Sequence, residues 1–387
     1  EGEGTGAAVL AARDRIDPAG DVVVLSGDHP LISPGTVAGL LAAHRADGAA
    51  ATLLTTEELD PAGYGRVVRL PDGGVARIVE TKRPEEATPE ELAIREINIG
   101  AYAFRGEDLL SALAAVGEAG GERYLTGVFP VLRERGRPIA AHPTPEVESA
   151  LGVNTRVDLM EVERRARRRL VEAHALAGVT FLAPDAVVLD AEVEIGEDSV
   201  IEAGVTLRGV TRIGRGCAVG PCTTMVSATL GDAVVARHAY VLESEVADGA
   251  TVGPFAYLRP GTRVGEGAKV GTFVELKNAH VGARAKVPHL SYLGDAEVGE
   301  GSNIAAGNIT ANYDARTRRK DRTVIGREVN TGVDAAFVAP VHVGDGAYIA
   351  AGSVITEDVP ARALGVARAR QRNVEGYADR PREEGRQ

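Results

Sequence analysis

Aliphatic residues recur at every sixth position through much of the second half of the chain. Four phased runs carry this period: Ile195, Ile201, Leu207, Ile213 and Val219; Val246, Val252, Leu258, Val264 and Val270; Val281, Val287 and Leu293, then after a phase slip Val298 and Ile304; and Val343, Ile349 and Ile355. An α-helix repeats every 3.6 residues and a β-strand every two, so neither produces this pattern. Hexapeptide turns of a parallel β-solenoid do, and the pattern predicts one from about Ile195 to Ile355.

Small residues often follow the aliphatic ones at once, as at Gly196, Gly214, Gly265, Gly282 and Gly299. We expect one aliphatic side chain on each face to point into the core, and the small residue after it to let the backbone turn the corner. A single coil cannot bury its own face, so stacking of the coils must supply the stability.

A helix is predicted from Asn154 to Ala177, just before the solenoid. Three- and four-residue spacing relates its apolar positions, which are Leu159, Val162, Ala166, Leu170 and Ala173. We expect Asp158 to be the N-cap and Gly178 to end the helix. The arginines at 164, 165 and 167–169 could bind an anionic partner, but a solvated face of a linking helix explains them better.

The region before Asn154 alternates strand and helix signals. Residues 21–25 (DVVVL) are a continuous apolar run that ends at Ser26, Gly27 and Asp28, and we expect a buried parallel strand there. Residues 33–47 predict a helix and residues 50–55 the next strand. This alternation indicates an α/β sheet with ligands at the carboxyl ends of its strands.

Composition narrows the functional classes. The 387-residue chain is 44% hydrophobic and 25% charged, with 47 glycines and 4% aromatic residues, which suits short strands and tight corners. A net charge of −12 gives no reason to expect nucleic-acid or anionic-membrane partners. Two cysteines are too few for a disulfide framework. No apolar run reaches membrane length and no signal peptide is found, so we expect a cytoplasmic protein.

Several motifs occur in a fixed order along the chain: GTG at Gly4, VLSGDHPLIS at Val24, GYGRV at Gly63, IVETK at Ile78, EINIGAYAF at Glu96, GVNTR at Gly152, YLRPGT at Tyr257, VELKNAHVG at Val274, PHLSYLGDAEVG at Pro288, ITANYD at Ile309 and AFVAPVHVGDGAYIAAGSVIT at Ala336. Together they resemble the bacterial bifunctional N-acetylglucosamine-1-phosphate uridylyltransferase/glucosamine-1-phosphate acetyltransferase family. The resemblance covers nearly the whole chain.

The resemblance implies a fold and an assembly. A Rossmann-like α/β nucleotidyltransferase domain would span residues 1–154, a linking helix 155–178, a left-handed parallel β-helix of hexapeptide repeats 179–360 and a C-terminal tail 361–387. The family forms homotrimers. It makes UDP-N-acetylglucosamine from glucosamine 1-phosphate, acetyl-CoA and UTP, which are its small-molecule partners.

For uridylyl transfer, the resemblance assigns Mg²⁺ to Asp28 and Asn154, whose oxygen atoms suit this cation. The remaining residues assigned to UDP-N-acetylglucosamine are Gly4, Thr5, Ser26, Gly27, Gly65, Glu80 and Asn98. The sequence departs from the family's pattern in two ways that affect this site. The chain opens at Glu1 with EGEGTG, like the interior of a domain, and the family's Gly-rich phosphate loop does not occur. We therefore expect uridylyl transfer to be impaired. Ile99 and Gly127 replace polar family residues and would weaken contacts near the sugar.

Acetyl transfer needs a base for the amine proton, and His289 in PHLSYLGD is the candidate, because imidazole exchanges protons near neutral pH. By resemblance, the sugar phosphate would be bound by Arg259, Lys277, Tyr292 and Asn303. Acetyl-CoA would be bound by Ala306, Asn312, Tyr313, Val333, Ala351 and Arg368. Val333 stands where the family usually has Ser, so one hydrogen bond to acetyl-CoA would be lost.

Three alternatives remain open. A non-catalytic regulatory subunit could share this architecture, although His289, Arg259 and Lys277 argue against it. A sugar-phosphate nucleotidyltransferase could carry a purely structural solenoid. A hexapeptide carbonic anhydrase would need three converging histidines, and the histidines of this chain do not have that spacing.

Overall fold

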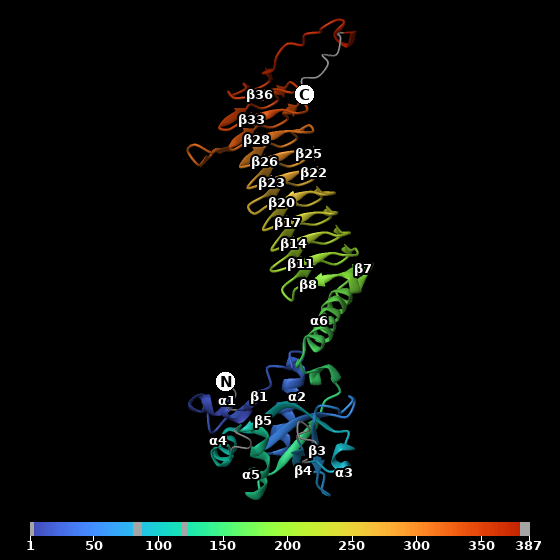
Figure 1. Ribbon diagram of the computed structural model, residues 1–387, viewed down its shortest axis with the longest axis vertical. Helices are drawn as coiled ribbons and strands as arrows, with labels where there is room; N and C mark the ends of the chain where they lie inside the picture. The colour runs from blue at the N-terminus through green and yellow to red at the C-terminus, as the bar shows by residue number, and fades with distance from the viewer. Residues whose placement is uncertain (1–3, 80–86, 118–121, 380–387) are drawn as a thin grey trace, which may run out of the picture. The chain divides into compact units, whose positions relative to one another are not determined.

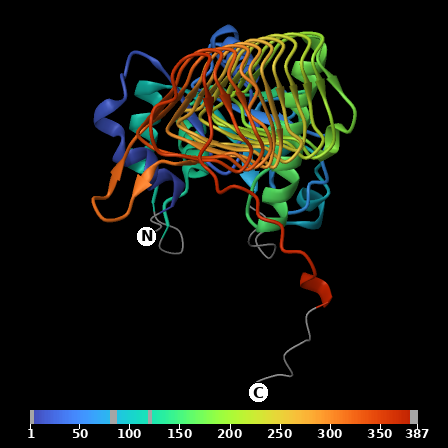
Figure 2. The ribbon, with the colours of Figure 1, turned by 90° about the horizontal axis from the view of Figure 1, so that it is seen from above.

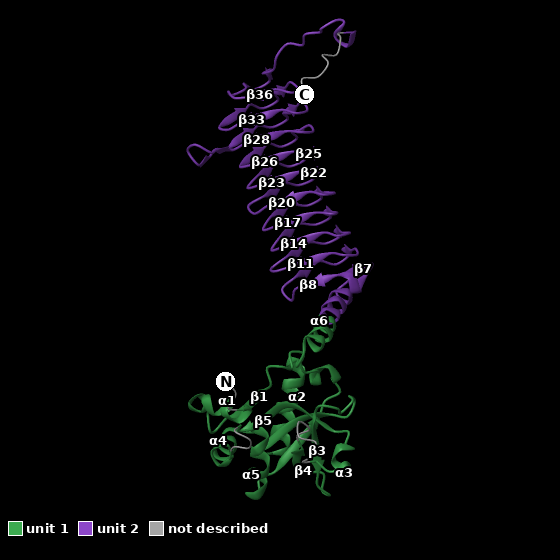
Figure 3. Cartoon of the chain, in the orientation of Figure 1, with its two compact units in different colours: residues 1–166 green, residues 167–387 purple. Residues whose placement is uncertain are grey.

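The computed structural model describes residues 4–79, 87–117 and 122–379, and the chain divides into two compact units, Glu1–Ala166 and Arg167–Gln387 (Figure 3). Within these described ranges, no helix is long and apolar enough to cross a membrane.

Unit 1 is built on one six-stranded sheet with the order β4-β3-β5-β2-β6, and β1 lies beside β5 (Figure 1). The strands are β1 (Asp21–Leu25), β2 (Ala51–Thr56), β3 (Gly65–Arg69), β4 (Val75–Val79), β5 (Ile97–Arg105) and β6 (Ile139–Pro143). The helices are α1 (Thr5–Ala11), α2 (Pro34–Asp47), α3 (Pro89–Leu92), α4 (Gly106–Ala115) and α5 (Val128–Glu134).

The two faces of this sheet pack into separate cores because side chains alternate along β5. Tyr102 and Phe104 pack with residues of α4 and α5 on one face, while Ala101 and Ala103 pack with Leu40 of α2 on the other. The predicted α/β sheet is confirmed, and the structure places helices on both of its faces.

The pairing predicted for the first strand was wrong. β1 is hydrogen-bonded antiparallel to β5, from Asp21↔Arg105 to Leu25↔Ala101, and it is only partly buried. β2 also pairs antiparallel with β5, so β1 and β2 run in the same direction but are separated by β5. An apolar run indicates burial but not which strand becomes its neighbour.

Helix α6 (Arg156–Leu176) begins one position after Thr155. The Thr155 side chain accepts a hydrogen bond from Asp158 N (3.2 Å), and Asp158 Oδ2 accepts one from Thr155 N (2.7 Å). Thr155 is therefore the N-cap, and Asp158, predicted as the cap, is its reciprocal partner in the first turn. These bonds lower the pKa of Asp158. Gly178 lies just beyond the helix with φ of 95°, in the left-handed region that favours glycine.

Unit 2 is a parallel β-solenoid, as predicted, and its strands stack into three faces (Figure 1). Face 1 contains β7 (Thr180–Phe181), β10 (Val200–Ile201), β13 (Ala218–Val219), β16 (Val235–Ala236), β19 (Thr251–Val252), β22 (Lys269–Thr272) and β25 (Lys286–His289), and it continues through Asn303 to β32 (Asn330–Thr331), β35 (Tyr348–Ile349) and β37 (Leu364–Gly365).

Face 2 contains β8 (Val188–Leu189), β11 (Thr206–Arg208), β14 (Thr224–Val226), β17 (Tyr240–Leu242), β20 (Tyr257–Leu258), β23 (Glu275–Lys277), β26 (Tyr292–Gly294), β28 (Ile309–Ala311), β33 (Ala336–Val338) and β36 (Val354–Ile355). Face 3 contains β9 (Glu194–Ile195), β12 (Arg212–Ile213), β15 (Thr229–Leu230), β18 (Glu245–Val246), β21 (Arg263–Val264), β24 (His280–Val281), β27 (Ala296–Val298), β31 (Thr323–Ile325) and β34 (Val341–Val343).

The aliphatic residues of the six-residue period are all buried in one continuous core, from Ile195 to Ile355. One excursion interrupts the stack, a hairpin formed by β29 (Tyr313–Asp314) and β30 (Arg319–Lys320). Figures 1 and 2 both show this orange hairpin projecting from the coils.

Most of the small residues after the aliphatic positions do not turn the corner, so that prediction was wrong. Left-handed backbone falls two residues further on, for example at Asp198 (φ 62°) and Arg284 (φ 55°). A Cβ built on Gly299 would lie 2.4 Å from the backbone of Gly326 in the next coil. The close approach of neighbouring coils is therefore what requires the small residue.

Candidate active sites

The turn after β1 presents Asp28 at the carboxyl end of that strand. Ser26 N donates to Gly100 O (3.2 Å), and His29 N donates to Ser26 O (3.3 Å), which closes the turn. A Cβ on Gly27 would meet nothing within 4 Å, so the turn faces open space at that position. Gly100 has a φ of 81°, and a Cβ there would lie 2.8 Å from Ser26 Oγ.

The segment before α6 lies directly against this turn. Val153 N donates to Asp28 O (2.8 Å), which brings the backbone of Asn154 next to the predicted partner ligand Asp28. The Asp28 side chain is 48% exposed, and its Oδ1 lies 2.9 Å from His29 Nδ1. His29 was not predicted to take part in the site.

These residues fit Mg²⁺, which keeps several water molecules and takes one or two protein oxygens together with substrate phosphates. A partly exposed carboxylate beside an asparagine-bearing segment supplies such a donor set. The part of the chain that the structure describes contains no group of three or more His, Cys, Asp or Glu side chains that could hold a metal ion by themselves.

Gly65 and Asn98 lie side by side as register partners of β3 and β5. Asn98 Nδ2 donates to the Tyr102 hydroxyl (2.8 Å), and Asn98 Oδ1 accepts from Gly100 N (3.2 Å). Thr5, by contrast, accepts a hydrogen bond from Leu125 N (2.9 Å).

Of the other residues predicted for the uridine site, those that the structure describes make contacts elsewhere in unit 1. A Cβ on Gly4 would collide with the backbone of Arg123, so Gly4 and Thr5 both contact residues 123–125 rather than the Asp28 turn. Glu80 lies outside the described residues. Ile99 is fully buried in the core on the α2 face, and a Cβ on Gly127 would lie 2.8 Å from Val116 Cγ1.

In the solenoid, His289 shares one corner with three residues predicted to bind acetyl-CoA. Lys286 pairs with Asn303, Asn303 with Asn330, and Asn330 with Tyr348. The residues three positions after these paired residues therefore form a column, which consists of His289, Ala306, Val333 and Ala351. We call this column corner 1. Neighbouring parallel strands are about 4.8 Å apart, so each member of the column lies one rung from the next.

The residues that follow corner 1 all have left-handed backbone, at Leu290, Gly307, Asp334 and Gly352 (φ 49°, 75°, 56° and 68°). The side chains of His289, Val333 and Ala351 are exposed, and that of Ala306 is half-buried. A Cβ on Gly332 would lie 2.3 Å from Ala351 N, so the coils are tightly stacked beside this column.

Face 2 carries a cluster of cations on the strands that follow the same corner. Leu258 pairs with Leu276, so Arg259 and Lys277 lie in register on adjacent coils. Arg259 Nη1 donates to Glu275 Oε1 (2.9 Å), and this bond raises the pKa of Arg259. We define the cation cluster as Arg259, Lys277 and Lys320.

Lys320, which was not predicted, comes from the β29–β30 hairpin. Its side chain lies within hydrogen-bonding reach of Lys277, and this contact, together with burial, lowers the pKa of Lys277. Burial alone would raise the pKa of Asp295, but hydrogen bonds from Asn278 and Asn312 and the charges of Lys277 and Lys320 hold it below its ordinary value. The cluster therefore carries an excess of positive charge suited to a phosphate.

Tyr292 and Asn312 meet beside this cluster. A Cβ on Gly294 would lie 2.4 Å from the Tyr292 hydroxyl and 2.9 Å from Asn312 Nδ2, so both polar atoms lie over that glycine. Asn312 donates to Asp295 Oδ2. Tyr292 and Asn312 were predicted as site residues, whereas Asp295 and Glu275, which also lie in the family motifs, were not.

Three predicted residues lie apart from this group. Asn303 is an exposed residue of face 1, whereas the cation cluster lies on face 2. Tyr313 is 55% exposed at the base of the hairpin. Arg368 is exposed and follows Ala367, whose carbonyl accepts from Val354 N (3.0 Å).

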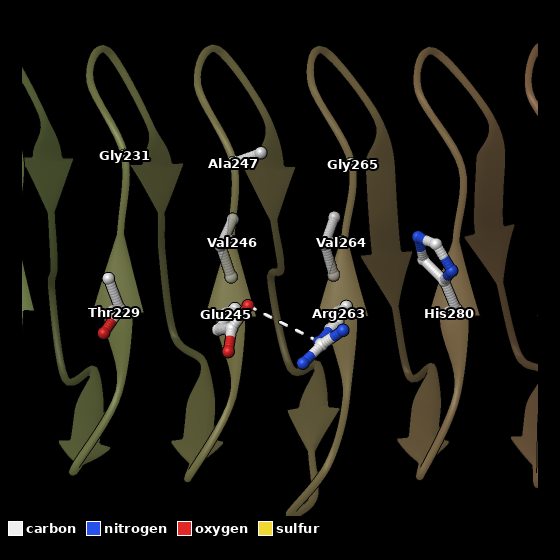
Figure 4. Close-up of a pocket in the computed structure, with 9 residues that line it drawn as sticks. All are labelled: Thr229, Gly231, Glu245, Val246, Ala247, Arg263, Val264, Gly265 and His280. Atoms are coloured by element: carbon white, nitrogen blue, oxygen red, sulfur yellow. Dashed lines mark ion pairs between the residues drawn. The ribbon is translucent and has the colours of Figure 1, made fainter.

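A separate groove on face 3 is lined by Thr229, Glu245, Arg263 and His280 (Figure 4). The ion pair between Arg263 Nε and Glu245 Oε2 (3.5 Å) joins two of its coils. None of the predicted site residues lines it.

The chain matches two protein families and many relatives. The nucleotidyl transferase family matches residues 1–145, and the hexapeptide repeat of succinyl-transferase matches residues 188–208 and 322–357. The bifunctional protein GlmU of Mycobacterium bovis is 47% identical over 383 residues, 98% of this chain and 76% of the relative. The GlmU proteins of Mycolicibacterium smegmatis (46% over 383 residues) and Corynebacterium efficiens (45% over 385 residues) share 98% and 99% of this chain and 78% of their own length.

Identity at this level runs through both units, and the two matched families correspond to the α/β sheet and to the solenoid. The chain therefore belongs to the bifunctional GlmU family, whose paired uridylyltransferase and acetyltransferase architecture its motifs resemble.

Proposed function

We propose that corner 1 and the cation cluster together form an acetyltransferase site for acetyl-CoA and glucosamine 1-phosphate. The observation that carries this proposal is the strand register, which stacks His289 one rung from Ala306. The chain is a bifunctional enzyme of UDP-N-acetylglucosamine synthesis by family membership, and neither a regulatory subunit nor a purely structural solenoid is favoured.

The reaction joins the substrate amine to the acetyl carbonyl carbon. As the C–N bond forms, His289 accepts the proton that the amine must lose. The C–S bond then breaks, and the coenzyme A thiolate leaves and takes up a proton. An exposed imidazole at the corner can reach both the amine and the thioester, because the two substrates would meet there.

The substrates are held on either side of that corner. The cation cluster would bind the sugar phosphate, with Tyr292 beside it. The small side chains of Ala306 and Ala351 leave space for the pantetheine arm along the column, whereas Val333 adds an apolar contact.

Uridylyl transfer belongs to unit 1. We infer that Asp28 and Asn154 would hold Mg²⁺, which neutralises phosphate charge when it is bound. Gly65 and Asn98 would position the sugar on β3 and β5. Serine and glycine in the turn of residues 26–28 leave room for the substrate to approach Asp28.

We also infer that the chain assembles as a homotrimer. Asn303 lies on face 1 and the cation cluster on face 2, so one chain does not gather every predicted sugar contact. A neighbouring copy would complete the set.

Replacing His289 by Ala tests the acetyltransferase proposal. The kcat of acetyl transfer should fall about 10²- to 10⁴-fold, the usual contribution of a positioned base. Binding of the sugar phosphate should change little, since its phosphate contacts the cation cluster. His280→Ala, an exposed histidine of face 3, is the matched control and should retain wild-type turnover. Near-normal kcat in His289→Ala would remove this residue from the mechanism.

A further inference from the structure

His29 is a polar side chain that the proposed chemistry leaves unused. Its imidazole is only 11% exposed, and it lies near the backbone of two glycines. A Cβ on Gly152 would lie 3.2 Å from His29 Nε2, and one on Gly100 would lie 3.9 Å from His29 Cε1. A side chain at residue 152 would crowd the ring, whereas one at residue 100 would make ordinary contact with it, so the imidazole lies close to the backbone of both glycines.

Among the residues that the structure describes, the ring has one hydrogen bond, which goes to the proposed metal ligand. His29 Nδ1 lies 2.9 Å from Asp28 Oδ1, and a carboxylate can only accept, so Nδ1 carries the proton. His29 Nε2 is buried and has no partner among the described residues. Buried polar groups normally have hydrogen-bond partners. For the His29 ring, Asp28 supplies that partner.

This hydrogen bond makes the two oxygens of the Asp28 carboxylate inequivalent. Oδ1 is occupied by His29, whereas the structure, within its described ranges, gives Oδ2 no hydrogen-bond partner. The backbone of Asp28 is fixed independently, because its carbonyl accepts from Val153 N (2.8 Å). The bond from Val153 N restrains the main chain of Asp28, and the bond from His29 restrains its side chain. Oδ2 is then the carboxylate oxygen that remains available to coordinate a metal ion.

We propose that His29 is a positioning residue for the metal-binding carboxylate of Asp28. It holds the side chain in the rotamer that presents Oδ2 to the cation. This inference rests on the proposed role of Asp28 as a Mg²⁺ ligand. Partners that orient a metal ligand commonly contribute 10- to 100-fold to metal affinity.

Titration of the full chain with Mn²⁺ alone, followed by electron paramagnetic resonance of the free ion, measures this effect without any turnover. His29→Leu removes the donor and should weaken Mn²⁺ binding about 10- to 100-fold. His29→Asn places an amide near the position of Nδ1 and should restore most of the affinity. His29→Gln reaches the position of Nε2 instead and should behave like His29→Leu.

The Asn and Gln variants keep the test decisive if His29→Leu does not fold, because both are polar and differ only in reach. His238→Leu, the same chemical change in unit 2, is the matched control and should leave the titration unchanged. Equal affinity in His29→Asn and His29→Gln would overturn the positioning role. A fall in His238→Leu equal to that in His29→Leu would also overturn it, because the signal would then come from unspecific binding.

Asp28→Asn separates this inference from the proposal on which it rests. Loss of Mn²⁺ binding in Asp28→Asn with normal binding in His29→Gln and His29→Leu would retain Asp28 as a ligand and reject His29. Unchanged binding in Asp28→Asn would reject the metal site itself, and the inference with it.

Discussion

Lys277 and Lys320 show how two like charges can prepare a site for an anion. The Lys320 contact and burial lower the pKa of Lys277 in the free protein. A phosphate bound between the two ammonium groups would offset their repulsion and favour the protonated form of Lys277. Binding of the sugar phosphate should therefore be linked to the charge of this one lysine.

The linkage predicts a pH dependence of product binding. Affinity for N-acetylglucosamine 1-phosphate, which has no amine of its own to titrate, should be highest while Lys277 is protonated. It should fall as the pH rises through the lowered pKa of Lys277. Lys320→Gln should weaken binding at neutral pH, yet shift the alkaline loss of affinity to higher pH, because the pKa of Lys277 returns toward its ordinary value. Calorimetric titration from neutral to alkaline pH measures both effects. A loss of affinity at the same pH in both proteins would show that Lys320 does not act on Lys277.

The sequence motifs predicted which residues belong to the site, but not which other side chains they contact. Arg259 and Lys277 were predicted, by resemblance, to bind the sugar phosphate. Lys320 was missed, because it lies in a run of basic residues that resembles a solvated loop, and only the hairpin pairing brings it to Lys277. His29 was missed for a similar reason, since its neighbours Gly100 and Gly152 are distant in sequence.

At the scale of the coil, the core depends on one aliphatic residue for each face. Leu293 of β26 is fully buried between Leu276 and the coil that follows. Its neighbours belong to separate coils, so they cannot readily close a cavity left by a smaller side chain.

Leu293→Ala should therefore lower the free energy of unfolding of unit 2 by about 2–5 kcal/mol. Leu182→Ala is the matched control, because Leu182 is 64% exposed, and its effect should stay within about 0.5 kcal/mol. Urea denaturation followed by far-ultraviolet circular dichroism compares the two variants. Equal losses of stability would show that the buried column is not what holds the coils together.

The period of six predicted the solenoid because each side chain of that column must be buried. It did not predict where the backbone turns. Arg284 and Asp198 adopt left-handed backbone without being glycine, so composition alone does not mark the corners. Similarly, the apolar run of β1 predicted a strand but not its antiparallel neighbour β5, since pairing depends on residues about 80 positions away.

At the scale of the whole molecule, the proposed assembly makes a direct prediction. A homotrimer should have three times the 40.3-kDa mass of the chain. Size-exclusion chromatography with light scattering at micromolar concentration measures this mass. Hexapeptide coils expose three flat faces, and association would cover part of them. A mass of a single chain would contradict the trimer and the shared sugar site.

Acetyl transfer to an amino sugar phosphate is the reaction that we propose for the solenoid of this chain. The most direct test mixes the purified protein with acetyl-CoA and glucosamine 1-phosphate and follows the release of free thiol. We expect one thiol for each N-acetylglucosamine 1-phosphate formed. When N-acetylglucosamine 1-phosphate replaces the amine substrate, we expect no release, because no amine is then available to attack. Thiol release with glucosamine 1-phosphate no faster than the spontaneous hydrolysis of acetyl-CoA, from a protein shown to be folded, would contradict this proposal.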